Sequence, residues 1–353
     1  MRGVLAACLA ACCLLWPPGA NAARLTLTFA GDCALGSDAE LQQTPGEFVP
    51  LVKEKGLGWP FSSVADILAE DDLTLVNLEC ALTDATRALN KKFTFRGPAA
   101  FADILTLGSV EAVNLANNHT QDYGPDGYRD TLAALDVRGI AYSQNRAYTL
   151  VNAAGIKVAL FGYLHPGRGK ALLTFFKQFD EARAAGARLI LVSYHWGVEY
   201  GQRHSFEQAR IARETIDRGA DAVIGTHPHV LQGMQLYKGK PILYSLGNFV
   251  YGGLSASQAR DTALVRAVFD VDVEQGDAAA RLAELRVIPC LISAKPLSEP
   301  QDYRPVPAEG EDAARVLAQL AAGAEGWPDD FFETGVYTAP QAALAILRDE
   351  TPP

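Results

Sequence analysis

Short apolar runs rich in β-branched residues alternate with amphipathic stretches through the first two thirds of the chain. The runs have the length of strands, and the stretches between them space their apolar residues nearer to 3.6 positions than to 2. This alternation predicts an α/β fold. The expected strands are Leu25–Ala30, Leu73–Asn77, Ala112–Leu115, Lys157–Tyr163, Arg188–Tyr194, Ala222–Gly225 and Ile242–Ser245. The expected helices lie near Ser62–Ala69, Ala99–Leu105, Gly127–Val137, Ala171–Ala185 and Ser205–Arg218.

The pattern changes after Gly252. Longer alternating runs, Ala263–Val273 and Leu282–Ile288, predict an antiparallel pair that closes a sheet. A stretch rich in proline and acidic residues then precedes an Ala/Leu-rich helix. We therefore expect a main domain over residues 23–295 and a linker with a small helical appendage over residues 296–353.

Residues 1–22 have the composition of a secretory signal, with an arginine, the apolar run Val4–Trp16 and the cleavage pattern Ala20-Asn21-Ala22. The run is too short for a permanent membrane span, and we expect none after cleavage. This predicts a secreted or periplasmic protein. Lipid anchoring is the less favoured alternative, because the Leu-Ala-Ala-Cys strings ending at Cys8 and Cys12 would leave a short apolar core.

The net charge of −10, without a dense stripe of Lys and Arg, argues against nucleic acid or an anionic membrane surface as a partner. An acidic polymer would need local cations to bind. After signal cleavage the cysteines are Cys33, Cys80 and Cys290, too few for a disulfide scaffold. We expect small buried thiols, with pairing of Cys33 and Cys80 as the alternative.

Unusual polar clusters follow directly after five of the expected strands. They are Gly31-Asp32, Asn77-Leu78-Glu79, Ala116-Asn117-Asn118-His119, Tyr194-His195-Trp196-Gly197 and Gly225-Thr226-His227-Pro228-His229. Open α/β sheets place their sites at the carboxyl ends of strands. Carboxylates, imidazoles and an amide oxygen suit Zn, Mn or Fe better than an all-oxygen calcium site. The expected metal ligands are Asp32, Glu79, Asn118, His195, His227 and His229, with His119 beside them.

Each cluster also has a structural explanation when it is taken alone. Gly31-Asp32 is a common strand-to-loop turn, and His195 could simply pack against Trp196. His227-Pro228-His229 is the strongest single motif, because the proline fixes the turn and separates two imidazoles. Five such clusters at five strand ends are difficult to explain by unrelated structural needs. Their joint occurrence favours a divalent-metal site.

Together these motifs resemble the CapA family of poly-γ-glutamate capsule biosynthesis, whose domain belongs to the calcineurin-like metallophosphoesterase superfamily. The resemblance covers roughly Leu25 to Tyr251 in family order. It rests on Phe29-Ala30-Gly31-Asp32, Asn77-Leu78-Glu79, Leu115-Ala116-Asn117-Asn118-His119 with Asp122-Tyr123-Gly124, His195-Trp196-Gly197-Val198-Glu199-Tyr200, His227-Pro228-His229-Val230-Leu231-Gln232 and Tyr244-Ser245-Leu246-Gly247-Asn248-Phe249.

The resemblance implies a four-layer α/β/β/α sandwich of the calcineurin-like metallophosphatase type, holding one or two divalent ions. It implies a bridging carboxylate at Glu79, one metal on Asp32 and His229, another on Asn118, His195 and His227, and a general acid at His119.

This sequence departs from the wider superfamily at its first motif, which usually reads Asp-x-His. Here Asp32-Cys33-Ala34 has no imidazole two residues on, so the first metal lacks a ligand. Three alternatives follow: a weakly occupied position, a ligand from elsewhere such as His165, or a single ion.

Four further residues are expected to contact the substrate or support the ligands: Asn117, Glu199, Asn248 and Arg96. Glu199 is expected to orient His195, as metal-bound histidines usually need an acceptor. Asn248 is expected in a tight turn lining the pocket, where a structural role is equally plausible. Arg96 could contact an anionic substrate, although an exposed cation at a strand edge is the more frequent explanation.

Two classes of function fit these features. The first is a secreted metal-dependent hydrolase that acts on a phosphoester or on a related bond of a cell-surface polymer. The second is a component of capsule synthesis or export that binds an anionic polymer on the old metallophosphatase scaffold with little catalysis. The complete histidine set favours the first class, and the ligand missing after Asp32 favours the second.

Overall fold

The computed structural model describes residues 22–253, 259–272, 280–296 and 298–340. The expected signal sequence lies outside the described residues except for its last position. Within them, no helix is both long enough and apolar enough to cross a bilayer.

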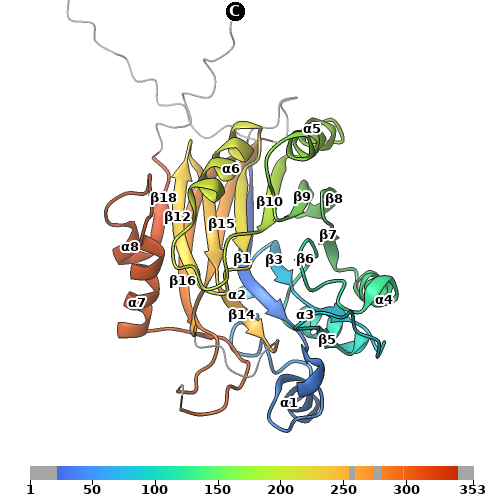
Figure 1. Cartoon of the computed structure of the whole chain (residues 1–353). Helices are drawn as coiled ribbons and strands as arrows, with labels where there is room; N and C mark the ends of the chain where they lie inside the picture. Colours follow the sequence, from blue (N-terminus) through green and yellow to red (C-terminus); the bar gives the residue numbers. More distant parts are fainter. Residues whose placement is uncertain (1–21, 254–258, 273–279, 297, 341–353) are drawn as a thin grey trace, which may run out of the picture.

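The larger sheet has a parallel half and an antiparallel half (Figure 1). Its strands follow one another in the order β17 (Val306–Pro307), β16 (Ala280–Leu291), β15 (Asp261–Asp272), β1 (Ala22–Ala34), β3 (Leu73–Leu78), β6 (Ala112–Asn114) and β7 (Ala141–Ser143). Off this path, β14 (Asn248–Tyr251) pairs with β1, and β18 (Val336–Thr338) pairs with β16.

The second sheet supplies the other wall of the core. Its strands follow the order β12 (Leu231–Tyr237), β13 (Lys240–Leu246), β11 (Ala222–Thr226), β10 (Leu189–His195), β9 (Ile156–Leu164) and β8 (Ala147–Ala153). A small sheet is formed by β2 (Ser37–Asp38), β5 (Phe95–Gly97) and β4 (Ala81–Leu82).

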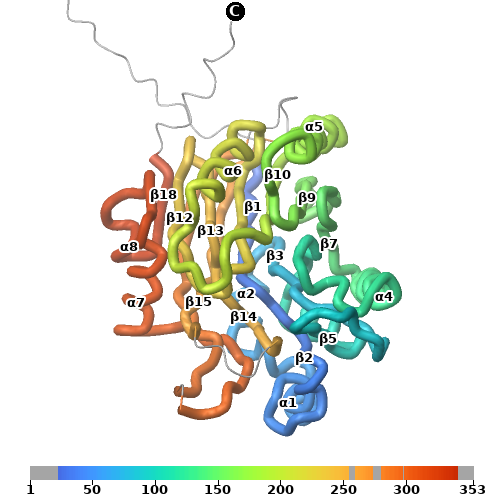
Figure 2. The backbone as a smooth tube through the Cα atoms, in the orientation of Figure 1, coloured from blue at the N-terminus to red at the C-terminus, as the bar shows by residue number. Residues whose placement is uncertain are grey.

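Helices cover the outer faces of the two sheets and close one edge of the space between them. They are α1 (Phe48–Lys55), α2 (Ala65–Leu68), α3 (Ala102–Leu107), α4 (Gly124–Asp136), α5 (Lys170–Ala184), α6 (Phe206–Asp217), α7 (Gly310–Ala321) and α8 (Phe331–Thr334), with short 3-10 turns η1 (Ala39–Leu41) and η2 (Ala99–Phe101). Figure 2 shows α7, α8 and β18 gathered at one side of the molecule, opposite α4.

Three apolar clusters separate the layers. One lies between the larger sheet and helices α1, α3 and α4, a second lies between the two sheets, and a third lies between the second sheet and helices α5 and α6. The order of layers is therefore helix, sheet, sheet, helix. This confirms the expected four-layer α/β/β/α sandwich.

Alternation along each strand decides which residues enter the cluster between the sheets. In β3, Leu73 and Leu75 face this cluster, whereas Val76 faces the helices. In β10, Leu189 and Leu191 face it. Because side chains alternate, the same face continues beyond the apolar residues to the polar groups at the strand ends.

A ladder of polar side chains crosses the larger sheet at these ends. Asp32, Asn77, Asn114 and Ser143 stand opposite one another on β1, β3, β6 and β7. Asn77 Nδ2 donates to Asp32 Oδ1 at 2.8 Å, Asn114 Nδ2 donates to Asn77 Oδ1 at 2.9 Å, and Ser143 Oγ donates to Asn114 Oδ1 at 3.1 Å. All four residues are buried, so the ladder satisfies polar groups that have no access to water.

A bulge in β1 turns Asp32 into this ladder. Phe29 is paired with Leu75, but Asp32 is paired with Asn77, so β1 holds one extra residue. The extra residue brings Asp32 onto the face that Phe29 occupies. Gly31 lies in the bulge, where an added Cβ would fall 1.9 Å from the carbonyl oxygen of Gly247. Only glycine allows this close approach.

The expected strands and the antiparallel pair β15–β16 are confirmed, as are helices α3 to α6 within a few residues. Strands β8, β12 and β14 and helix α1 were not expected. In β12 the polar residues Gln232 and Gln235 are buried. Because buried polar residues interrupt the hydrophobic pattern, that pattern does not predict this strand. The helix of the C-terminal segment contributes Val316 and Leu320 to the cluster between the sheets.

The cysteines Cys33, Cys80 and Cys290 are buried free thiols. Burial raises the pKa of the Cys33 and Cys290 thiols to about 12. They therefore pack as small apolar groups, as expected.

We predict that Asn77→Leu lowers the free energy of unfolding by about 3 kcal/mol, because it removes the side-chain amide that forms hydrogen bonds with Asp32 and Asn114 in the buried ladder. The measurement is urea denaturation followed by circular dichroism. Asn152→Ala, at an exposed position of β8, is the control and should stay within about 0.5 kcal/mol of the parent. Equal stability of both variants would show that the ladder does not hold the strands together.

Candidate metal centre

The expected ligands converge on the space where the two sheets meet. Asp32 and Glu79 come from the larger sheet, at the end of β1 and just after β3. His195 ends β10, and His227 and His229 follow β11 in the second sheet. All five side chains are buried.

These donors form overlapping groups in which each residue offers an atom within 4.8 Å of the others: Glu79 with His195 and His227, Asp32 with Glu79 and His229, and Glu199 with His227 and His229. Glu79 belongs to two of these groups, as a bridging carboxylate would.

Two other expected ligands lie close to His195 Nε2. Glu79 Oε1 lies 3.4 Å from this nitrogen, about the separation of two tetrahedral ligands that are each about 2.1 Å from zinc. Asn118 Oδ1 lies 2.7 Å from it, a hydrogen-bond distance, so these two atoms would have to move apart to share an ion.

Glu79 provides the strongest test of whether a metal fits. Both of its carboxylate oxygens are fully buried and have no hydrogen-bond partner among the described residues. A buried carboxylate without such partners costs several kcal/mol unless a cation compensates its charge. His227 Nδ1 is likewise buried and unpartnered. The donor set therefore fits a divalent ion.

The pKa shifts within the cluster also favour a bound cation. Burial and the neighbouring Asp32 raise the pKa of Glu79 well above its usual range. Burial lowers the pKa of His227 to about 4 and that of His195 well below its ordinary value, so both stay neutral and keep a lone pair for a metal. Burial opposes charge on His229, but Glu79 and Asp32 outweigh it and raise its pKa to about 10. Two carboxylates thus attract positive charge here.

The backbone that carries the two histidines of the His-Pro-His motif is strained. His227 has φ 98° and His229 has φ 59°, both in the left-handed region. Such conformations cluster at functional sites, where the surrounding structure holds them in place. The imidazole centroids lie 6.0 Å apart. The strained turn lets both rings approach one cluster.

Neighbouring polar groups orient the imidazoles. Asn248 Oδ1 lies 2.9 Å from His229 Nδ1, and Thr226 Oγ1 lies 3.1 Å from His195 Nδ1. In both rings Nε2 is left to face the cluster. Glu199, expected to orient His195, instead lies beside His227 and His229 within ligand reach.

His165 does not fill the position left by the missing Asp-x-His imidazole. Its ring centroid lies 5.3 Å from that of His227 and 6.3 Å from that of His195. Its backbone N–H donates to the carbonyl of His195 at 2.9 Å. His165 therefore lies on the side of the group formed by Glu79, His195 and His227, because β9 lies beside β10 and away from Asp32.

His119 stands beside the ligands with a partner of its own. Its Nδ1 lies 2.7 Å from Asp122 Oδ2, and its ring stacks on Phe95 with centroids 4.1 Å apart. Lys91 donates to Asp122 Oδ1 at 2.6 Å and to the carbonyl of Asn118 at 2.8 Å. These contacts fix the ring and leave Nε2 available.

The two remaining expected residues have structural contacts. Asn117 Oδ1 accepts hydrogen bonds from the backbone N–H groups of His119 and Thr120, so it shapes the turn that carries Asn118 and His119. Arg96 donates to the carbonyl of Thr83 at 3.3 Å and covers the ring of Tyr123.

Sequence reasoning missed Lys91, Thr226 and Tyr251. Thr226 was within a quoted motif, but only the pairing of His195 with Thr226 on adjacent strands reveals its role. Tyr251 is buried with its ring 5.2 Å from that of His229. Lys91 lies in a loop without any motif, so no local signal identifies it.

Comparison with known proteins gives a consistent picture. The family described as bacterial capsule synthesis protein PGA_cap matches residues 26–252. The PGA biosynthesis protein CapA of Bacillus subtilis is 31% identical over 267 residues, which cover 69% of this chain and 67% of that protein. The capsule biosynthesis protein CapA of Bacillus anthracis is 29% identical over 272 residues, covering 69% of this chain and 63% of that protein. The chain thus spans about two thirds of the length of these relatives.

Among solved structures, the sulfate thiohydrolase SoxB of Thermus thermophilus aligns over 87% of this chain and 62% of its own, with 17% identity and a TM-score of 0.41.

We predict that the two groups of ligands differ in metal affinity. His195→Ala should weaken binding of the more tightly held ion at least about a hundredfold, because His195 belongs to the group with Glu79 and His227 and lies beside Asn118. Asp32→Ala should keep that ion. Calorimetric titration with Mn²⁺ and Zn²⁺ and elemental analysis of the purified variants measure both effects. His204→Ala is the control, since His204 stacks on Tyr244 outside these groups. Loss of the ion from Asp32→Ala but not from His195→Ala would contradict the assignment.

Proposed function

Because the chain belongs to the bacterial capsule synthesis protein family PGA_cap, we propose that it acts in the biosynthesis of a polyglutamate capsule or a related cell-surface polymer. The relatives named for this role align over 69% of this chain. The metal centre is the part of this chain that we assign to that role.

One observation carries the chemical part of the proposal: the buried carboxylate of Glu79 has no hydrogen-bond partner among the described residues and lies within ligand distance of the neutral imidazoles of His195 and His227. We assign Glu79, Asn118, His195 and His227 to one ion and Asp32, Glu79 and His229 to a second position, with Mn, Zn or Fe as the metal. A divalent ion bound there supplies Lewis acidity at a phosphoryl or carbonyl oxygen.

The residues of the chain supply the remaining steps. We assign His119 the role of donating a proton from Nε2 to a leaving group, which the contact of its Nδ1 with Asp122 supports. Lys91 holds Asp122 and the turn that carries His119, and its ammonium group adds positive charge where an anionic leaving group would depart. Burial of the cluster excludes water that would weaken these interactions.

The composition of residues 1–22 supports export, and we propose that the protein works outside the cytoplasm, where a capsule polymer is assembled. Capsule synthesis or export machinery is the partner class that follows from this location.

A second candidate is a general metal-dependent phosphoesterase without a role in capsule synthesis. The arrangement of His119, Asp122 and Lys91 favours it, because a histidine held by a buried carboxylate is what acid catalysis at a leaving group requires.

We predict that the protein hydrolyses p-nitrophenyl mono- or diesters in the presence of Mn²⁺ or Zn²⁺. His119→Ala should lower kcat at least about a hundredfold without loss of metal, because general acid catalysis contributes on that order. His227→Ala should lose both metal and turnover. Release of p-nitrophenol is followed at several metal concentrations, and bound metal is measured in parallel.

The matched control is His204→Ala, which lies outside the donor groups and should turn over like the parent. Metal binding without turnover by the unmodified protein would contradict hydrolysis and would favour a binding role in capsule assembly. Turnover that is unchanged in His119→Ala would remove His119 from the proposed chemistry.

A further inference from the structure

The turn that follows β10 brings a further carboxylate to the metal centre. This turn spans residues 198–201, and the N–H of Gly201 donates to the carbonyl of Val198 at 3.0 Å. Glu199, its second residue, offers an oxygen within 4.8 Å of donor atoms of His227 and His229. Small movements of the side chains would therefore let Glu199 share an ion with an imidazole.

Hydrogen bonds hold this turn against the His-Pro-His motif. The N–H of Tyr200 donates to the carbonyl of Pro228, the middle residue of the motif, at 2.7 Å. Gln232, a buried residue of β12, donates from Nε2 to the carbonyl of Gly201 at 2.6 Å. Tyr200 keeps a φ of 61° in a place that glycine usually occupies. The backbone of Glu199 is thus fixed beside the motif.

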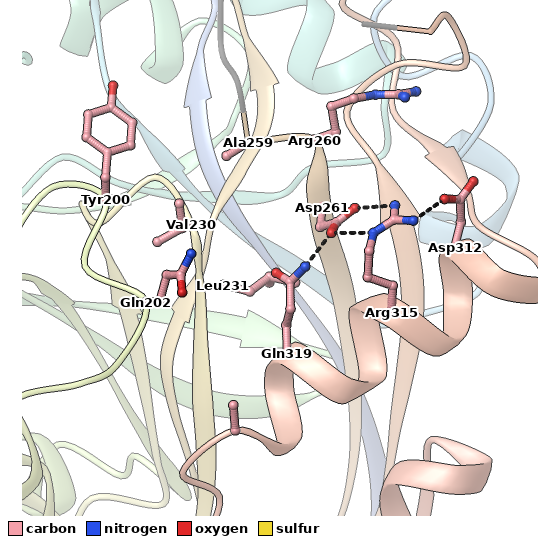
Figure 3. Close-up of a pocket in the computed structure, with 11 residues that line it drawn as sticks. Tyr200, Gln202, Val230, Leu231, Ala259, Arg260, Asp261, Asp312, Arg315 and Gln319 are labelled. Carbon is pink, nitrogen blue, oxygen red and sulfur yellow. Dashed lines mark hydrogen bonds and ion pairs between the residues drawn. The ribbon is translucent and has the colours of Figure 1, made fainter.

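The turn also borders open space. Tyr200, Gln202 and Val230 line part of a cavity of about 620 Å³ (Figure 3). Glu199 is itself exposed, whereas Glu79 is fully buried. Glu199 therefore reaches the imidazoles from the solvent side, and its carboxylate is available to an ion without the desolvation cost that Glu79 carries.

The second position of the centre lacks a donor. Asp32, Glu79 and His229 form a group of three, whereas an ion of this kind binds at least four donors. Ala34, two residues after Asp32, is buried and has no donor atom in its side chain. His165 lies on the side of the other group. The fourth donor must therefore come from another element or from solvent.

His229 connects Glu199 with this second position. It belongs both to the group with Asp32 and Glu79 and to the group with Glu199. The other imidazole near Glu199 is that of His227, which is assigned to the first ion. Its Nδ1 is buried and has no hydrogen-bond partner among the described residues, so Glu199 does not orient this ring through a hydrogen bond.

We propose that Glu199 is a ligand of the second divalent ion and completes the donor set of Asp32, Glu79 and His229. The inference rests on the metal centre of the proposed function. With Glu199 the second position has three carboxylates and one imidazole, a donor set that suits Mn²⁺. The added negative charge also lowers the repulsion between two neighbouring cations.

We predict that Glu199→Gln binds the first Mn²⁺ ion like the parent and the second at least about tenfold more weakly, because the amide keeps the shape of the side chain and loses its charge. Glu199→Asp should also weaken the second ion, because the fixed turn cannot compensate for the shorter side chain. The measurements are calorimetric titration with Mn²⁺ and electron paramagnetic resonance, in which two neighbouring Mn²⁺ ions give a spin-coupled signal. Retention of the first ion shows that the variants are folded.

The matched control is Glu181→Gln, which makes the same change at an exposed residue of α5 and should bind both ions like the parent. Unchanged affinity of Glu199→Gln for the second ion would overturn the proposal and leave the metal centre in place. Loss of the first ion from Glu199→Gln would also overturn it, because Glu199 would then support His227. A parent protein that binds one ion would refute the second position, and one that binds none would refute the metal centre as well.

Discussion

The common register of the parallel strands in the larger sheet is the constraint on which the metal centre depends. Asn77 stands two residues after Leu75 and two before Glu79, so the face that buries the leucine also carries the amide and the carboxylate. A slip of one residue would turn Asn77 and Glu79 toward the helices. The apolar core therefore restricts the ligands, because a register that buries Leu75 between the sheets also keeps Asn77 and Glu79 on the face toward the second sheet.

The alternation of side chains also positions a histidine on the second sheet. Leu191 packs between the sheets, and His195 lies four residues further along the same face of β10. Bringing these groups together has two local costs. The buried carboxylate of Glu79 has no hydrogen-bond partner in the part of the chain that the structure describes, and His227 and His229 have left-handed backbone. Rigid strands on both sides can hold such features, which a flexible loop would relax. A cation would remove the largest of these costs, since it would compensate the two carboxylates.

The sequence predicted the strands and the residues that come together between the sheets because both depend on local signals. Alternation identifies a strand, and a polar cluster at its end marks the site. It could not predict the bulge that turns Asp32 inward, since this depends on the close approach of Gly31 to Gly247. Nor could it decide the role of His165, because the order of strands puts β9 beside β10 and away from β1. Lys91 was missed because its loop reaches Asp122 through the fold and not through any repeat or motif.

The candidate ligands lie at strand ends, whereas Lys91, which holds Asp122 beside His119, lies in a loop. A change at Lys91 would therefore leave the register of the sheets untouched. Against a net charge of −10, an anionic polymer would need cations close to the site. Salt screens exposed charges beyond about 8 Å, so a bound carboxylate would be affected more by the nearest ammonium or guanidinium group than by distant acidic residues. In the proposed function, Lys91 is such a cation beside the metal centre.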